Sequence, residues 1–182
     1  MQMNSNKNTL IFLDIDGVLN NETSKTVFTV ADKSEDYSID ETNFQRLLKL
    51  LFDLEHFGKV KVVIHSGWIK YQHDPNATWN WSDGRSFKTL LPKVIKRLGV
   101  FSIGCIDYYP KTSKKTKILK WLEKHPEYDS WNKFVIDDDE SEYNALNELI
   151  YERNNIIFCP TNPKYGLQQQ TVNNIVRTVQ NS

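Results

Sequence analysis

The chain has 182 residues, of which 39% are hydrophobic and 12% aromatic. This length and composition suit one compact domain with a substantial core and argue against a second domain. The 23 lysine and arginine residues balance 23 aspartate and glutamate residues. No net charge therefore draws the chain to nucleic acid or to an anionic membrane, although a local basic patch is compatible with this balance.

Two features indicate the surroundings of the chain. The first nine residues are polar and lack the apolar centre of a signal peptide, and no apolar stretch is long enough to cross a bilayer. Cys105 and Cys159 have neither metal-ligand nor redox spacing and stand in apolar contexts that suit buried thiols. We therefore expect a reducing, cytoplasmic location without membrane contact. We also expect a flexible segment over residues 1–9 and a single domain over residues 10–182.

The first predicted element is a strand over residues 10–13, where four bulky apolar residues follow one another without a helical period. Asp14 and Asp16 come at its end, and Gly17 lets the chain turn just beyond them. Open α/β sheets bind ligands at the carboxyl ends of their strands. Two acids one residue apart can divide the roles of nucleophile and proton donor. The competing interpretation is a helix cap or a solvated turn.

The next part of the chain predicts a helix and a second strand. Residues 21–38 are polar and indicate a loop over the strand ends. Asp40 begins an amphipathic helix that Gly58 ends. Residues 60–65 predict a strand that leads into Ser66, so a second strand end carries a small hydroxyl group.

An irregular segment over residues 68–86, rich in Trp, Asp and Asn, follows this strand. Its aromatic side chains either stack on nucleic-acid bases or a phosphotyrosine ring, or form a small satellite core under a loop. The helix that follows covers residues 87–98, and we expect Pro92 in its first turn. The aromatic side chains of the segment are Trp68, Tyr71, His73, Trp79 and Trp81.

The rest of the chain alternates strands with helices. The strand over residues 134–136 runs directly into Asp137 and Asp138, whereas Asp139 and Glu140 suit the solvated start of a helix. Strands that alternate with helices predict an α/β fold with a mostly parallel sheet and helices on both faces. The remaining predicted elements are a short strand over residues 100–106, a lysine-rich helix over 113–124, a strand over 155–159 and a helix over 168–179.

Three predicted strands thus end in polar side chains, at Asp14 and Asp16, at Ser66, and at Asp137 and Asp138. Because parallel strands end at one edge of their sheet, we expect these residues to meet there. In this order, with a lysine near the start of the intervening helix, the motifs resemble those of the haloacid dehalogenase (HAD) superfamily of phosphotransferases. The resemblance implies a HAD-like Rossmannoid three-layer sandwich.

Several short stretches of the sequence also resemble the HAD branch found in Swiss Army knife RNA-repair proteins. The domains of this branch are capless or have a minimal cap. The similarity covers about residues 10–179, although Ile69 stands where this branch suggests an arginine. The stretches that carry it are residues 16–20, 65–68, 135–139 and 163–167, and Lys115 with Ile118 and Trp121-Leu122.

The resemblance implies a role for each residue at the strand ends. Asp14 would be the nucleophile that becomes a phosphoaspartate, and Asp16 the general acid and base. Ser66 and Gly67 would bind the phosphoryl group. His65 is expected to pack rather than react, since alternation turns it away from the face of Ser66. The implied Mg²⁺ ligands are Asp14, the backbone carbonyl of Asp16, Asp138 and Asp137.

A lysine would balance the negative charge of the nucleophile and the phosphoryl group. Several lysines lie over residues 111–120, and most of them suit a solvated helix face. Lys115 fits the family pattern best, because the apolar Ile118 follows three positions later. Lys114 and Lys117 are the alternatives.

The expectation is therefore a Mg²⁺-dependent phosphatase with an open site. The stretches 16–66 and 66–115 leave no room for a full cap domain, which favours a macromolecular or chain-end phosphomonoester. A nucleic-acid end comes first and a phosphoprotein, such as one that carries phosphotyrosine, second. A non-enzymatic phospho-accepting signalling domain also combines acids, a hydroxyl and a lysine, but its acidic pair belongs at the first strand.

Overall fold

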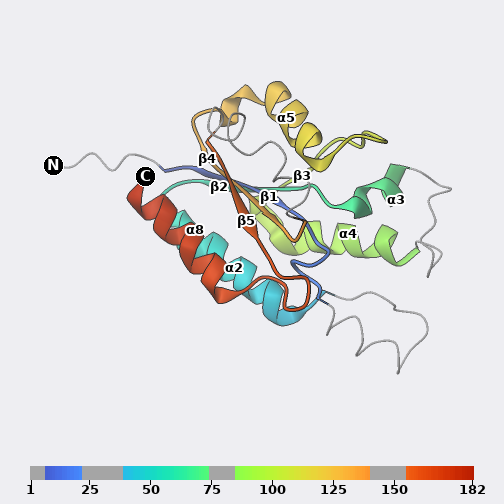
Figure 1. The fold of residues 1–182 in the computed structure, drawn as a ribbon, viewed down its shortest axis with the longest axis horizontal. Coiled ribbons are helices and arrows are strands. Elements are labelled where there is room, and N and C mark those ends of the chain that lie inside the picture. Colours follow the sequence, from blue (N-terminus) through green and yellow to red (C-terminus); the bar gives the residue numbers. More distant parts are fainter. Residues whose placement is uncertain (1–6, 22–38, 74–84, 140–154) are drawn as a thin grey trace.

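A computed structural model of the chain describes residues 7–21, 39–73, 85–139 and 155–182. Within these ranges, parallel strands form one five-stranded sheet in the order β3-β2-β1-β4-β5 (Figure 1). The predicted α/β class with a parallel sheet is confirmed. The strands are β1 (Thr9–Leu13), β2 (Val60–Ile64), β3 (Ser102–Cys105), β4 (Asn132–Asp137) and β5 (Ile156–Pro160).

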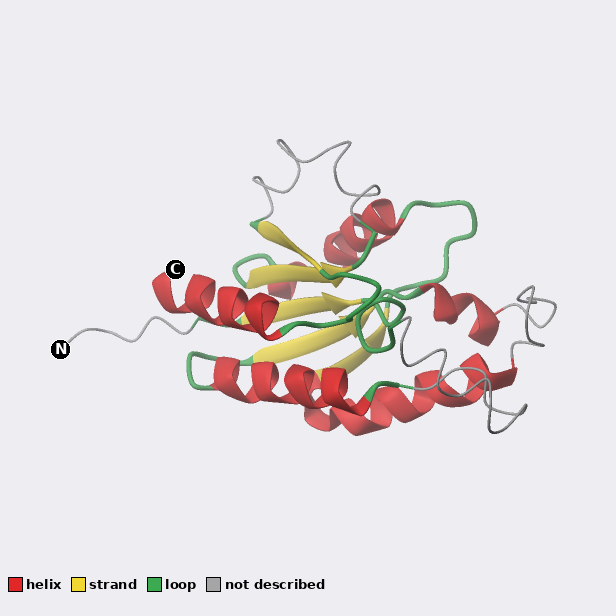
Figure 2. Ribbon diagram, turned by 60° about the horizontal axis from the view of Figure 1, so that its bottom comes forward, coloured by secondary structure: helices red, strands yellow, loops and turns green. Residues whose placement is uncertain are grey.

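Helices cover both faces of the sheet. Figures 1 and 2 show α5 on one face and α2, α4 and α8 on the other. The helices in the described ranges are α2 (Glu41–Glu55), α3 (Lys70–His73), α4 (Arg85–Leu98), α5 (Lys114–Lys124) and α8 (Gln169–Asn181). Short 3₁₀ turns are η1 (Gly67–Ile69), η2 (Gly99–Phe101) and η3 (Pro126–Tyr128).

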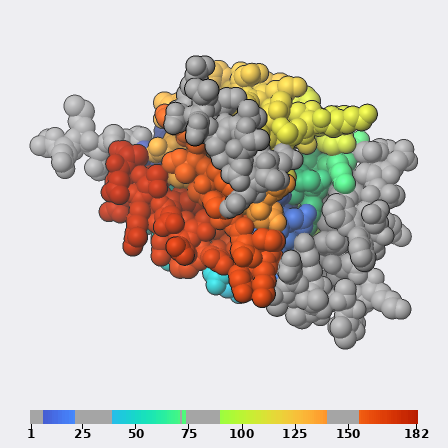
Figure 3. All heavy atoms as spheres, viewed as in Figure 1, coloured from blue at the N-terminus to red at the C-terminus, as the bar shows by residue number. Residues whose placement is uncertain are grey.

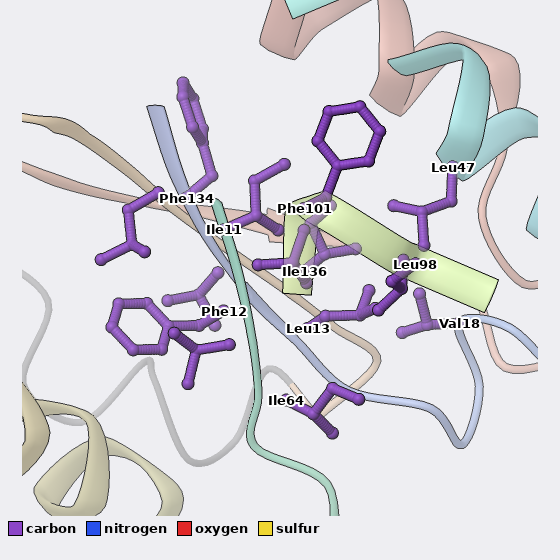
Figure 4. Close-up of a cluster of buried hydrophobic side chains, with 14 of the residues drawn as sticks. Ile11, Phe12, Leu13, Val18, Leu47, Ile64, Leu98, Phe101, Phe134 and Ile136 are labelled. Carbon is purple, nitrogen blue, oxygen red and sulfur yellow. The ribbon is translucent and has the colours of Figure 1, made fainter. Parts of the chain in front are cut away.

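Strand β1 forms the centre of the core, and all five of its residues are buried. Its side chains alternate between the two faces, which explains the unbroken apolar run in the sequence. Ile11 and Leu13 lie toward Leu98, and Phe12 lies on the opposite side (Figure 4). The Phe12 ring meets the Trp121 ring of α5 edge to face, with centroids 5.5 Å apart. Each such buried side chain contributes about 1.5–3 kcal/mol through the hydrophobic effect.

The helix predicted after Asp40 is confirmed as α2. Asp40 lies just before it, and the Asp40 side chain accepts a hydrogen bond from the Asn43 N–H at 3.0 Å. Such an N-cap stabilises a helix by about 1 kcal/mol. The helix turns an apolar stripe that includes Phe44, Leu47 and Leu51 toward the sheet.

Most boundaries differ from the predictions by one or two residues, and the predicted strand over residues 100–106 is the turn η2 followed by β3. Strand β1 begins at Thr9, and the preceding Lys7 N–H donates to the Phe57 carbonyl at 3.0 Å. Helix α4 begins at Arg85, so Pro92 lies inside the helix and not in its first turn. Pro92 is exposed, and an interior proline forfeits one backbone hydrogen bond that the helical turns on either side must offset.

Several expectations fall outside the described residues. They concern the loop over residues 22–38, the aromatic side chains of Trp79 and Trp81, and Glu140. The expectation of a missing or minimal cap rests in part on these segments and stays a prediction. Among the described helices, none has the length and apolar character needed to cross a membrane.

Candidate active site

The carboxyl ends of three neighbouring strands carry the predicted functional side chains. Leu13 of β1 pairs with Ile64 of β2 on one side and with Ile136 of β4 on the other. Asp14 therefore follows β1 directly between Ser66, which follows β2, and Asp137, the last residue of β4. This register brings the ends of β1, β2 and β4 side by side, in agreement with the expectation that their polar side chains lie at one edge of the sheet.

Asp14 is buried, with 2% of its surface exposed, and both of its carboxylate oxygens have donors. The Ile15 N–H donates to Asp14 Oδ1 at 2.7 Å, and Lys114 Nζ donates to Asp14 Oδ2 at 2.5 Å. The Asp14 N–H donates to the Ile136 carbonyl at 3.0 Å, which anchors the residue to β4. These contacts hold one carboxylate in a single orientation, as a nucleophile requires.

Lys114 connects Asp14 to Asp137. Its Nζ also lies 3.0 Å from each carboxylate oxygen of Asp137. Burial opposes the charge on the Lys114 ammonium, but the neighbouring carboxylates of Asp14 and Asp137 outweigh that effect and raise its pKa above the ordinary value. Lys114 is therefore a fixed cation at the edge of the sheet.

This geometry corrects the expectation that Lys115 faces the nucleophile. Lys115 is buried on α5 beside Ile118, and burial lowers its pKa. Neighbouring helical residues point about 100° apart, so Lys114 reaches the strand ends while Lys115 joins the packed face. An apolar residue three positions after Lys115 marks that packed face. The signal that favours Lys114 is Ser113, whose side chain caps α5 and makes Lys114 its first residue.

The two acids at the end of β4 complete a group of carboxylates. Asp137 is fully buried, and burial together with the negative charge of Asp14 raises its pKa to about 7, against the attraction of Lys114. Burial and the charge of Asp14 also raise the pKa of Asp138. The Asp139 N–H donates to Asp137 Oδ1 at 2.9 Å and orients that side chain.

Asp14, Asp137 and Asp138 can together hold a cation. Each offers one carboxylate oxygen, and these three oxygens lie within 4.8 Å of one another. Gly17 has a φ of +67°, and a side-chain carbon there would overlap the carboxylate of Asp138. Close-set hard oxygen ligands suit Mg²⁺, and a cation would relieve the crowding that raises the pKa values of Asp137 and Asp138.

The sequence matches the family described as the HAD domain in Swiss Army Knife RNA repair proteins over residues 10–172. The chain belongs to this family. The match covers β1 from Leu10 onward and the other four strands of the sheet, and membership indicates phosphatase-type hydrolase chemistry. Comparisons with curated proteins and with solved structures gave no match.

The second acid of this HAD domain, Asp16, has hydrogen-bond donors of its own. Asp16 Oδ1 accepts a hydrogen bond from Asn20 Nδ2 at 2.9 Å, and Asp16 Oδ2 accepts one from Trp68 Nε1 at 2.8 Å. Asn20 Oδ1 in turn accepts from the Gly17 N–H at 3.0 Å, which fixes the direction of the amide. The Asp16 side chain is thus positioned by donors, and its backbone carbonyl as a Mg²⁺ ligand stays a prediction.

Ser66 and Gly67 continue the HAD site beyond β2. Ser66 is buried and caps the 3₁₀ turn η1, where its Oγ accepts from the Trp68 N–H at 3.3 Å. Gly67 is exposed, and among the described residues other than its chain neighbours no heavy atom lies within 4 Å of the position that its side-chain carbon would take. The backbone at Gly67 is therefore open to an approaching phosphoryl group.

His65 is buried next to Asp137 of the HAD domain, and the expectation that it faces away from Ser66 stays a prediction. Its Nε2 lies 3.7 Å from Asp137 Oδ2, beyond hydrogen-bond distance. Burial lowers the pKa of His65 to about 4, although the charge of Asp14 acts in the opposite direction. His65 is therefore neutral at physiological pH and adds no positive charge to the site.

Proposed function

We propose that this HAD domain is a Mg²⁺-dependent phosphatase that acts through a phosphoaspartate at Asp14. The observation that carries the proposal is the pairing of Asp14 with Lys114 at 2.5 Å, within a group of three carboxylates that includes Asp14 itself. An attacking carboxylate and a phosphate dianion repel each other unless cations neutralise them. Lys114 supplies one such charge, and bound Mg²⁺ would supply the other.

The reaction divides into two steps. In the first, an Asp14 oxygen forms a bond to phosphorus as the bond between phosphorus and the leaving oxygen breaks, and Asp16 donates a proton to that oxygen. In the second, Asp16 takes a proton from water, whose oxygen attacks phosphorus and frees the Asp14 carboxylate. Inorganic phosphate then leaves. Asp14, Asp137 and Asp138 would hold the Mg²⁺ in both steps.

The metal assignment predicts different behaviour for two neighbouring acids. Asp138→Ala should raise the Mg²⁺ concentration for half-maximal phosphate release by at least about tenfold, the smallest effect usual for residues that support metal ligands. It should also lower kcat at saturating Mg²⁺, because a ligand oxygen is lost. Phosphate release measured over a Mg²⁺ titration, with a chelator as the zero point, tests this.

Asp139→Ala is the matched control, because Asp139 supports Asp137 through its backbone N–H, which alanine retains. Its Mg²⁺ response should equal that of the wild type. Equal responses in the two alanine variants would remove Asp138 from the set of ligands. Phosphate release that is unaffected by the chelator would remove the metal from the proposal.

The proposed substrate is the phosphorylated end of a nucleic acid. The family match is to HAD domains of RNA repair proteins, and the described residues around the site support a polymer substrate. The loop over residues 161–167 lies beside the Asp14–Asn20 loop, since Thr161 Oγ1 donates to the Gly17 carbonyl at 2.9 Å and the Leu167 N–H donates to the Val18 carbonyl at 2.9 Å. Figure 3 shows the two segments together on the surface, in orange and blue.

Other contacts hold this loop rigid while one aromatic side chain faces solvent. Arg46 donates to the Leu167 carbonyl at 3.1 Å, and Asn43 donates to the Tyr165 carbonyl at 3.3 Å. Tyr165 is 52% exposed, and Lys164 Nζ lies 5.3 Å from the centre of its ring. A rigid exposed ring next to a cation is suited to stacking on a base and contacting a phosphate.

Tyr165→Ala should therefore lower kcat/KM for a 3′-phosphorylated oligonucleotide by roughly 5- to 150-fold, the range that follows from a loss of about 1–3 kcal/mol of stacking. Tyr165→Phe, which keeps the ring, should retain the wild-type value. 4-Nitrophenyl phosphate, which lacks bases, should respond to neither substitution. Equal losses on both substrates would rule out base stacking by Tyr165, and a wild type that prefers a phosphotyrosine peptide would favour the phosphoprotein alternative.

A further inference from the structure

The side chain of Asp16 is held by donors from two different parts of the chain. Asn20 belongs to the same loop, but Trp68 belongs to η1 beyond the neighbouring strand β2. The Trp68 indole is 1% exposed, and its Nε1 lies 2.8 Å from Asp16 Oδ2. This contact joins the loop after β1 to the turn after β2.

Backbone hydrogen bonds and packing hold Trp68 in place. Its backbone N–H donates to the capping oxygen of Ser66, and the Ile69 N–H donates to the Ser66 carbonyl at 3.2 Å. The indole fills buried space and has one polar atom, so its orientation is set by packing and by a single donor. A phenylalanine would fill most of the same space without donating a hydrogen bond.

Two donors on one carboxylate restrict its rotation. Asn20 holds Oδ1 with an amide that the Gly17 N–H keeps in one orientation, and Trp68 holds Oδ2. A proton donor works only when it lies at hydrogen-bond distance from the leaving oxygen. The orientation of the Asp16 carboxylate is therefore a requirement of the first step, and the indole of Trp68 contributes to it.

We propose that Trp68 is a positioning residue for the proton-transfer group Asp16, an inference that rests on the proposed function. Ser66, Gly67 and Trp68 then form one unit, in which the first two residues face the phosphoryl group and the third orients the acid. The chemistry served is protonation of the leaving oxygen. Its importance grows with the basicity of that oxygen.

Leaving-group dependence separates this role from a general loss of structure. With Mg²⁺ present, Trp68→Phe should lower kcat/KM, which reports phosphoryl transfer to Asp14 and not the later step in which Asp16 is the base, by about 10- to 100-fold on a 3′-phosphorylated oligonucleotide. The sugar hydroxyl of this substrate is a poor leaving group, and the loss is a part of the contribution usual for general acid–base catalysis. On 2,4-dinitrophenyl phosphate, whose leaving group needs no proton, the loss should stay below about threefold. Loss of the same size on both substrates would overturn the inference.

Two comparisons make this test specific. Trp121→Phe is the matched control, because Trp121 is also buried but packs against Phe12 in the core; its ratio of the two rates should equal that of the wild type. In the Asp16→Asn background, Trp68→Phe should cause no further loss on the oligonucleotide. An additive loss there would show that Trp68 does not act through Asp16.

A second replacement at position 68 tests whether Trp68→Phe acts through a change in packing. Incorporation of 3-benzothienylalanine at position 68 keeps the fused-ring shape and removes only the N–H donor, and it should reproduce the leaving-group dependence of Trp68→Phe. Wild-type rates on both substrates in that protein would overturn the inference. A wild-type protein inactive on both substrates would overturn the proposed function, whereas an active one with equal losses overturns the role of Trp68 alone.

Discussion

Replacement of Asp14 by asparagine should lower kcat by roughly 10⁴- to 10⁶-fold, the scale of effect when a covalent nucleophile is removed. The amide has nearly the same shape, and its oxygen can still accept from the Ile15 N–H, but it cannot attack phosphorus. Acid-quenched wild-type enzyme should carry a phosphoryl group on Asp14, detectable by mass spectrometry. The variant should carry none.

The fold should survive the Asp14→Asn substitution. The change removes one of three crowded carboxylates, so Asp137 loses a repelling neighbour while Lys114 keeps Asp137 as its partner. The circular dichroism spectrum and the melting temperature should therefore stay close to those of the wild type. A folded variant that retains wild-type turnover would rule out the phosphoaspartate.

Lys114→Met should lower kcat by about 10²- to 10³-fold, the usual cost of one preorganised group that stabilises developing charge. The substitution leaves the carboxylates of Asp14 and Asp137 without the cation between them. Their repulsion then favours protonation of Asp137, whose pKa already lies above the ordinary value. Steady-state phosphate release with saturating Mg²⁺ measures the loss.

Lys115→Met is the control for this prediction, since it makes the same change one residue along α5. Lys115 faces the packed side of the helix, so its replacement should change kcat by less than about threefold in a protein that remains folded. The reverse outcome, with activity lost in Lys115→Met and kept in Lys114→Met, would restore the assignment that the spacing to Ile118 suggests.

The central strands and their ends could be predicted because their signal is local. An unbroken apolar run predicts a strand buried on both faces, and the acids after β1 and β4 stand directly at the ends of such runs. The cap at Asp40 is equally local, since a short polar side chain before an amphipathic pattern predicts a helix start.

The roles of Lys114 and of the Trp68 indole could not be predicted, because they depend on contacts between distant parts of the chain. Lys114 and Lys115 differ by one step around α5, and the sheet decides which of them reaches Asp14. The contact between Trp68 and Asp16 joins two loops through the rotation of the turn η1. The position of Pro92 in its helix was also predicted wrongly. An exposed proline is tolerated within a helix that has turns on both sides, so its presence does not mark the first turn.

The middle position of β1 has a consequence for the chain while it is being synthesised. Thr9 pairs with Val60 on one side and with Asn132 on the other. The edge of β1 that pairs with β4 therefore stays without its partner strand until most of the chain has left the ribosome. An apolar strand with an open edge is a template for pairing with other chains. Protection of the nascent N-terminal half, by a chaperone or by rapid translation as far as β4, would therefore govern how much folded protein a cell obtains.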